Sequence, residues 1–122
     1  PVVLDWAFAQ GRATRLDSFL MGPSGYGYVF PGNMSRQSDI DWFTNATAAA
    51  AASLGMHGVV HWDVDRFLDR GTTARTEAVL RRYAGSAVRG VFQLASDPLP
   101  PANQTPTWLL RAGAALPVFK PA

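Results

Sequence analysis

The sequence predicts an α/β fold built from parallel β/α units. Short apolar runs alternate with stretches of helical periodicity, in the order strand, helix, strand, helix, strand. Strands separated by helices in this way pair in parallel through right-handed crossovers. Two closures fit the pattern, an open doubly wound sheet and a (β/α) barrel. A barrel needs roughly 250 residues, so this chain would supply about half of one.

Each expected element has a local signal. In chain order, we expect strands at residues 2–4, 19–21, 58–62, 88–95 and 116–119, and helices at residues 38–54 and 73–84. Ser38 is placed to cap the first helix, with Asp41 three residues later in a near capping box. Gly55 and Gly85 stand where the two helices should end. Residues 97–107 are rich in proline, and we interpret them as a loop.

The loop after residues 19–21 has the most informative composition in the chain. Residues 22–32 combine four glycines, two prolines and three aromatic residues. Glycine permits positive φ or a close approach of the backbone, and proline fixes φ. Aromatic rings in such a loop either wedge it against the body of the protein or present flat faces to a ligand. Because glycines flank Tyr26, we expect Tyr26 or Tyr28 to be exposed, and we interpret the loop as a site.

Part of this loop resembles the signature of the GxGYxYP family of putative glycoside hydrolases, in its C-terminal domain. Gly25, Gly27, Tyr28 and Pro31 match the signature, and Phe30 stands where the family has tyrosine. The resemblance covers most of the chain. It implies a barrel-like fold and hydrolysis of a glycosidic bond in carbohydrate. The missing hydroxyl at Phe30 removes any hydrogen bond made from that ring and leaves stacking possible.

The candidate catalytic residues are aspartates that follow the expected strands. Parallel α/β folds bind ligands at the carboxyl ends of their strands, and glycoside hydrolysis needs two carboxyl groups with rings to stack on sugars. We predict Asp63 and Asp5 as the catalytic pair, with Asp65 and Asp97 as alternatives, although an aspartate after a strand is often only a cap or turn former. The expected substrate-binding residues are those of the motif: Gly25, Tyr26, Gly27, Tyr28, Phe30 and Pro31.

Other chemistries fit the sequence less well. His57 and His61 lie near Asp63 at a spacing that resembles a metal site, but we interpret them as hydrogen-bonded structural histidines and predict no metal or cofactor. The glycine-rich loop lacks the Lys-Ser/Thr pair of a P-loop, and Ser24 is not in a GxSxG elbow. For Trp6 and Trp62 we expect core packing rather than a sugar platform.

Composition excludes several partners. The net charge is +2 and the arginines are scattered, so we expect no nucleic-acid surface. No apolar run approaches the roughly 18 residues of a membrane helix, and the absence of cysteine excludes disulfides. All three asparagines, Asn33, Asn45 and Asn103, open glycosylation sequons. We therefore expect a glycoprotein of the extracellular space or the secretory pathway.

We interpret residues 1–122 as one partial domain of a longer protein, because the chain begins at Pro1 and both ends look cut. The remainder of that protein would then be a partner of this segment. Three functions stay open from the sequence: a glycoside hydrolase, a non-catalytic carbohydrate-binding domain that uses the same aromatic loop, and a purely structural loop.

Overall fold

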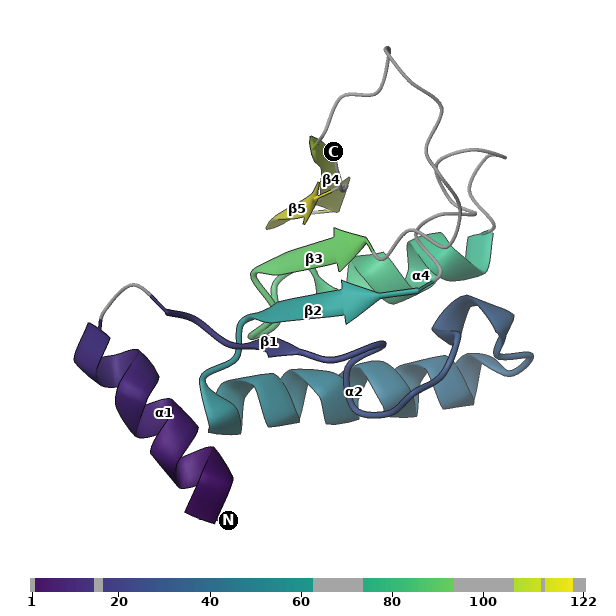
Figure 1. Cartoon of the computed structure of the whole chain (residues 1–122). Coiled ribbons are helices and arrows are strands. Elements are labelled where there is room, and N and C mark those ends of the chain that lie inside the picture. The colour runs from purple at the N-terminus through teal and green to yellow at the C-terminus, as the bar shows by residue number, and fades with distance from the viewer. Residues whose placement is uncertain (1, 15–16, 63–73, 94–106, 113, 120–122) are drawn as a thin grey trace, which may run out of the picture.

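The computed structural model describes residues 2–14, 17–62, 74–93, 107–112 and 114–119, which form one sheet with helices packed against it (Figure 1). The strands are β1 (Leu20–Met21), β2 (Gly58–His61), β3 (Gly90–Gln93), β4 (Thr107–Ala112) and β5 (Ala114–Phe119). The helices are α1 (Val2–Thr14), α2 (Gln37–Leu54) and α4 (Ala74–Tyr83), with a short 3-10 helix, η1 (Pro31–Asn33). The predicted α/β fold is confirmed.

The strand order is β1-β2-β3-β5-β4, and every pairing is parallel except that of β4 with β5. The parallel strands follow chain order without a reversal. In a doubly wound sheet the order reverses at a switch point, whereas consecutive strands lie side by side in the wall of a (β/α) barrel. The observed order of the parallel strands agrees with a barrel wall, and the barrel itself stays a prediction.

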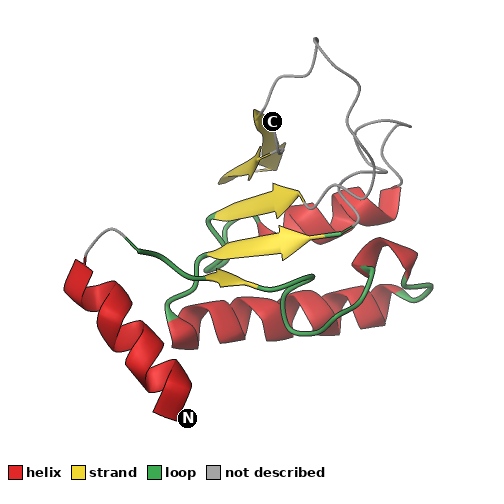
Figure 2. Cartoon of the chain, in the orientation of Figure 1, coloured by secondary structure: helices red, strands yellow, loops and turns green. Residues whose placement is uncertain are grey.

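The hydrophobic core lies between the sheet and the helices α2 and α4, which cover the same face (Figure 2). Val59, Val91 and Val118 are in register on adjacent strands and are fully buried against these helices. The facing helical residues recur at helical spacing: Ile40, Phe43, Thr47 and Ala51 on α2, and Val79, Leu80 and Tyr83 on α4. Burial of these side chains is the main favourable term for folding.

The opposite face of the sheet is also apolar but is less well covered. Phe92 and Phe119, which are paired in register, stack with ring centroids 4.7 Å apart. A hollow of about 250 Å³ lies on this face, lined by Leu20, Gly58, Gly90 and both phenylalanines among other residues. In a complete barrel such side chains would fill the interior.

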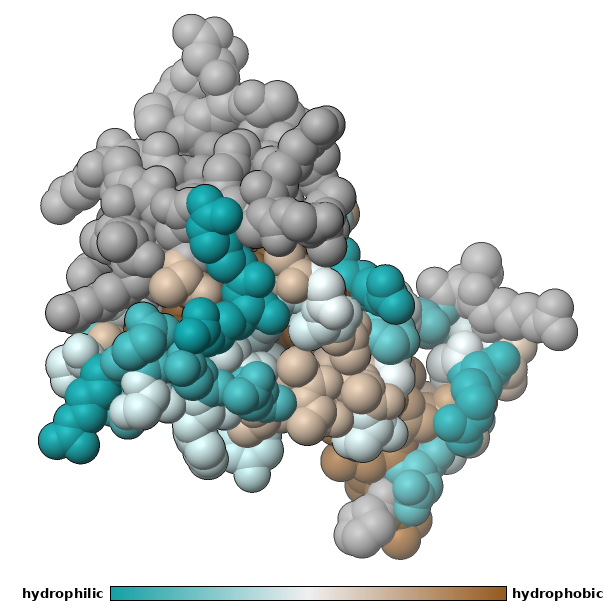
Figure 3. All heavy atoms as spheres, turned by 180° about the vertical axis from the view of Figure 1, so that it is seen from behind, coloured by the Kyte–Doolittle hydropathy of each residue, from teal (hydrophilic) through white to brown (hydrophobic). Residues whose placement is uncertain are grey.

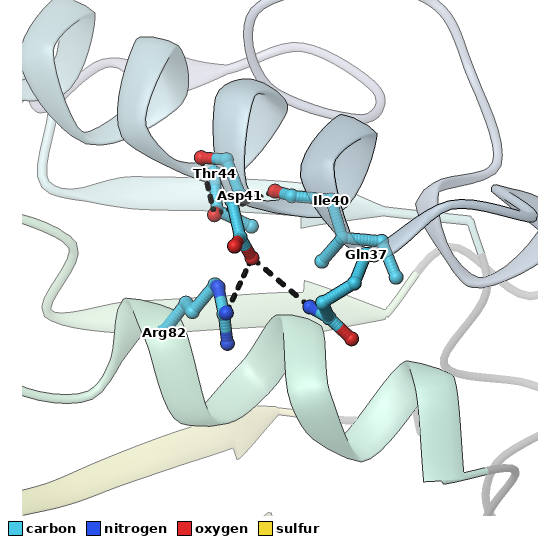
Figure 4. Close-up of polar contacts among 5 residues, drawn as sticks. All are labelled: Gln37, Ile40, Asp41, Thr44 and Arg82. Atoms are coloured by element: carbon cyan, nitrogen blue, oxygen red, sulfur yellow. Dashed lines mark hydrogen bonds and ion pairs between the residues drawn. The ribbon is translucent and has the colours of Figure 1, made fainter.

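Helix α2 starts differently from the prediction and ends as predicted. Its N-cap is Arg36, without a side-chain capping bond, and Ser38 lies inside the first turn, so the predicted capping by Ser38 is wrong. Asp41 does not close a capping box, because it accepts a hydrogen bond from Gln37 Nε2 (2.9 Å) and pairs with Arg82 of α4 (Figure 4). Gly55 ends the helix in the left-handed conformation, with φ 67°.

The prediction of a strand at residues 2–4 is wrong, because these residues begin helix α1. The three apolar residues favour a strand locally, but the residues that follow sustain a helix of 13 residues. Asp5 therefore lies in the first turn of a helix, where its charge complements the helix dipole, and not at the end of a strand.

Helix α1 packs against the body through few residues. Its one buried residue is Gly11, whose missing Cβ leaves room for the ring of Phe19, and Phe8 contacts the same ring. Trp6 is 64% exposed, so its expected place in the core is wrong. Apolar residues gather on the surface at the start of this helix, at the lower right of Figure 3.

The remaining boundaries agree with the sequence to within a few residues. β3 begins at Gly90, two residues later than expected, and Gly85 follows α4 with φ 85°. The sequence does not predict strand β4, which begins at Thr107, where the expected proline-rich loop of residues 97–107 ends. None of the helices in the described ranges is long and apolar enough to cross a membrane.

Candidate functional site: an aromatic loop at the ends of β1 and β2

The motif loop follows β1 and is tied to two neighbouring elements. Ser24 is fully buried, and its Oγ accepts a hydrogen bond from the backbone N–H of Trp62, directly after β2 (3.3 Å). The backbone N–H of Tyr26 donates to Thr47 Oγ1 on α2 (3.1 Å). The loop is therefore held to the carboxyl end of β2 and to α2, as the predicted site at this edge requires (Figure 1).

The two glycines around Tyr26 meet different requirements. Gly25 has φ +112°, and a Cβ there would lie 2.6 Å from Thr47 Cγ2 and 2.8 Å from Thr47 Oγ1. A side chain at this position is thus opposed both by backbone conformation and by the neighbouring helix. A Cβ at Gly27 would meet no described atom within 4 Å. Only Gly25 is needed for the approach of the loop to α2.

Two rings of the motif pack on the tryptophan that follows β2. Tyr28 meets Trp62 edge to face, with ring centroids 5.7 Å apart, and Phe30 lies 5.9 Å from the same ring. Tyr28 is 71% exposed, as expected for a loop that presents a ring to solvent. An edge-to-face partner covers at most one face of a ring, so the ring contacts of the described residues leave a flat face of Tyr28 available to a ligand. Trp62 is half-buried and belongs to this aromatic surface, which core packing alone would not explain.

A second ring pair lies on the α2 side of the loop. Tyr26 and Trp42 meet edge to face, with centroids 5.7 Å apart and planes at 88°. Trp42 is not among the site residues predicted from the sequence. Its signal was present in the helical spacing, because Ile40 and Phe43 face the core and Trp42 between them does not.

Pro31 shapes the exit of the loop. It is buried and begins η1, where Met34 N–H donates to Pro31 O (3.1 Å) and Asn33 N–H donates to Phe30 O (2.9 Å). Of the expected substrate-binding residues, Gly25 and Pro31 therefore shape the backbone, whereas Tyr26, Tyr28 and Phe30 supply the rings.

Asp5 is the member of the predicted catalytic pair that lies within the described residues, and it does not lie at this loop. Asp5 lines a hollow with Ser53 at the C-terminal end of α2, whereas Trp42 and Thr47 of the same helix adjoin the motif. Ser53 is 11 residues beyond Trp42, which at the rise of an α-helix is about 16 Å. The other candidate aspartates, Asp63, Asp65 and Asp97, lie outside the described residues.

The expectation that both histidines are hydrogen-bonded is confirmed for His57 and, among the described residues, not for His61. His57 Nδ1 lies 2.9 Å from the carbonyl oxygen of Ala87, as expected for a hydrogen-bonded histidine. His61 is fully buried at the end of β2, edge-on to the ring of Tyr83, and neither of its ring nitrogens has a hydrogen-bond partner among the described residues. Burial lowers the pKa of His61 from 6.5 to about 4, so the ring is neutral near pH 7. Over the described ranges, no three His, Asp or Glu side chains gather into a metal site.

These observations define an α/β domain that presents aromatic side chains at the carboxyl ends of parallel strands. The chain matches the family described as GxGYxYP putative glycoside hydrolase C-terminal domain over residues 1–107. It belongs to this family, as the motif indicated. A search of curated proteins gave no match, and a search of solved structures gave none either.

Proposed function

We propose that this domain binds carbohydrate through the motif loop and takes part in the hydrolysis of a glycosidic bond. The observation that carries the proposal is the exposed aromatic surface of Tyr28 and Phe30 on Trp62, beside the ends of two parallel strands. Aromatic faces stack on flat ligand rings, and ligands bind at this edge of parallel α/β sheets. The family description points to the same substrate class.

Hydrolysis also needs two carboxyl groups on either side of the scissile bond. Their separation in glycoside hydrolases is about 5–10 Å. Asp63 follows Trp62 directly in the sequence and is our preferred catalytic acid. Asp5 lies beside the far end of α2, so a second carboxylate is better sought at Asp65 or Asp97.

A non-catalytic carbohydrate-binding domain is the second candidate. The exposed rings of the loop suffice for binding without any carboxylate pair. Turnover therefore distinguishes the two candidates, whereas sugar binding is common to both.

The test uses the intact protein and a panel of oligosaccharides and chromogenic glycosides. We expect Tyr28→Ala to weaken oligosaccharide binding by about 1–3 kcal/mol, a range taken from stacking of flat ligands on aromatic rings. Tyr28→Phe should cost much less, because it keeps the ring. Titration calorimetry measures both changes. Unchanged binding in Tyr28→Ala would exclude the loop as the sugar site.

In the same experiment, Asp63→Asn removes the proton-transfer group and keeps the size of the side chain. A catalytic Asp63 predicts lost turnover with retained binding. If the unmodified protein binds sugar and cleaves no glycoside of the panel, the binding domain is the better description. A lowered melting temperature in Asp63→Asn would assign a structural role to Asp63.

A further inference from the structure

We propose that Trp42, which lies outside the motif, is a second sugar-binding residue. Trp42 and Tyr26 form one ring pair, and Tyr28 and Trp62 form another. The ligand of this domain is then an oligosaccharide that contacts both pairs. The inference rests on the proposed function, since it extends the surface made by Tyr28, Phe30 and Trp62.

Packing of the core does not require a tryptophan at position 42. Ile40 and Phe43 on the same helix are 1% and 2% exposed, whereas Trp42 is 63% exposed. Its ring contact is with Tyr26, which is itself 57% exposed. Tryptophan is buried to a high degree on average in folded proteins, so two large exposed rings held against each other indicate a surface that a ligand covers.

The geometry of this pair is fixed from one helix. Thr47 lies five residues after Trp42 on α2, and its Oγ1 accepts the hydrogen bond from Tyr26 N–H. Gly25 lets the loop approach Thr47 closely enough for that bond to form. The backbone of Tyr26 and the side chain of Trp42 are thus both positioned by α2, and the pair needs little ordering when a ligand binds.

Each of the two ring pairs includes one tyrosine of the motif loop. Tyr26 and Tyr28 are two residues apart, so their Cα atoms are separated by at most about 7 Å. Their partners differ, because Tyr26 meets Trp42 on α2 and Tyr28 meets Trp62 after β2. A single sugar ring stacks on one pair, whereas a chain of sugars can contact both. Trp42 should therefore matter for oligosaccharides and not for monosaccharides.

The chain offers a closely matched control for this test. Trp6 is 64% exposed on α1, against 63% for Trp42, and its neighbour Asp5 lines a hollow with Ser53, at the other end of α2 from the motif. In the intact protein we would measure the binding of cellopentaose, chitopentaose and maltopentaose, and of glucose and N-acetylglucosamine, by calorimetry. We expect Trp42→Ala to weaken pentasaccharide binding about fivefold or more and to leave monosaccharide binding unchanged. Trp6→Ala should change neither, and Trp42→Phe should restore part of the loss.

The outcomes separate this inference from the proposed function. If Tyr28→Ala loses binding while Trp42→Ala behaves like Trp6→Ala, the inference about Trp42 is wrong and the proposed function stands. An equal loss of monosaccharide and pentasaccharide binding in Trp42→Ala would contradict two separate contacts. If the unmodified protein binds none of the sugars, both proposals fail. Because Trp42 is exposed, its replacement should leave the melting temperature unchanged, and a large decrease would contradict its assignment to the surface.

Discussion

Gly25 and Gly27 are equivalent letters in the family signature, but the structure gives them different roles. An alanine at Gly25 would need positive φ and would contact Thr47 at less than 3 Å. We expect Gly25→Ala to lower the free energy of unfolding by about 1–3 kcal/mol. Gly27→Ala, where the Cβ meets open space, should change it by less than about 0.5 kcal/mol. Denaturant unfolding of the two variants gives both values, and equal losses would contradict the role assigned to Thr47.

His61 makes stability depend on pH in a direction that its burial fixes. The unfolded chain binds a proton at this histidine below about pH 6.5, whereas the folded protein does not until about pH 4. The free energy of unfolding should therefore fall as the pH decreases from 6.5 to 4, by roughly 3 kcal/mol in total from this group, and no further below pH 4. Among the described residues, Tyr83 is the titratable residue whose ring lies against His61.

Replacing the histidine isolates this contribution. The difference in unfolding free energy between the unmodified protein and His61→Gln should change between pH 6.5 and pH 4 and stay level outside that window. His57→Gln is the matched control, since His57 is exposed. If His57→Gln altered the pH profile as much as His61→Gln, burial of His61 could not be the cause.

At the scale of elements, a charged contact between Asp41 and Arg82 joins α2 and α4 (Figure 4). Asp41 of α2 pairs with Arg82 of α4 and also accepts a hydrogen bond from Gln37. Both charged side chains are more than a third exposed, so the pair is screened by solvent. We expect Arg82→Ala to lower the free energy of unfolding by only about 0.2–1 kcal/mol.

A double-mutant cycle with Asp41→Ala measures the pair directly. Asp41→Ala should cost somewhat more than Arg82→Ala, because it also removes the acceptor for Gln37. The coupling energy should fall in 1 M NaCl, where the Debye length is about 3 Å. A coupling that was large and independent of salt would mean that the pair is shielded from water.

The errors of the sequence analysis also lie at the scale of elements. Residues 2–4 resemble a strand because a run of three apolar residues is too short to show helical periodicity. The helical signal is spread over all 13 residues of α1. Serine is a common N-cap residue, so Ser38 was a reasonable candidate. The local sequence gives no sign that Asp41 pairs with Arg82 of another helix. The buried strands were predictable, because parallel strands covered by helices appear as continuous apolar runs.

At the scale of the whole molecule, the position of the motif loop at the end of β1 was predictable, but the residues from other elements that contact the loop were not. The motif loop does follow β1, as expected from strand order. The residues that complete it come from far along the chain, with Thr47 lying 21 residues after Tyr26 and Trp62 lying 38 residues after Ser24. Contacts at such separations leave no local signal. Asp63, the secreted location and the barrel closure stay predictions.

The two hydrogen bonds that hold the loop have a consequence for engineering and for sequence searches. The seven-residue string from Gly25 to Pro31 cannot be transplanted alone, because the backbone it needs is anchored by a threonine hydroxyl on α2 and by the peptide that follows β2. A graft onto another scaffold would have to carry Ser24, Thr47 and Trp62 with the spacing between them, because Ser24 accepts the bond from Trp62 N–H and lies outside the string. A sequence search that required these anchoring residues as well as the string would select proteins able to form this aromatic surface. A search for the string alone would also select chains in which the loop has neither hydrogen bond.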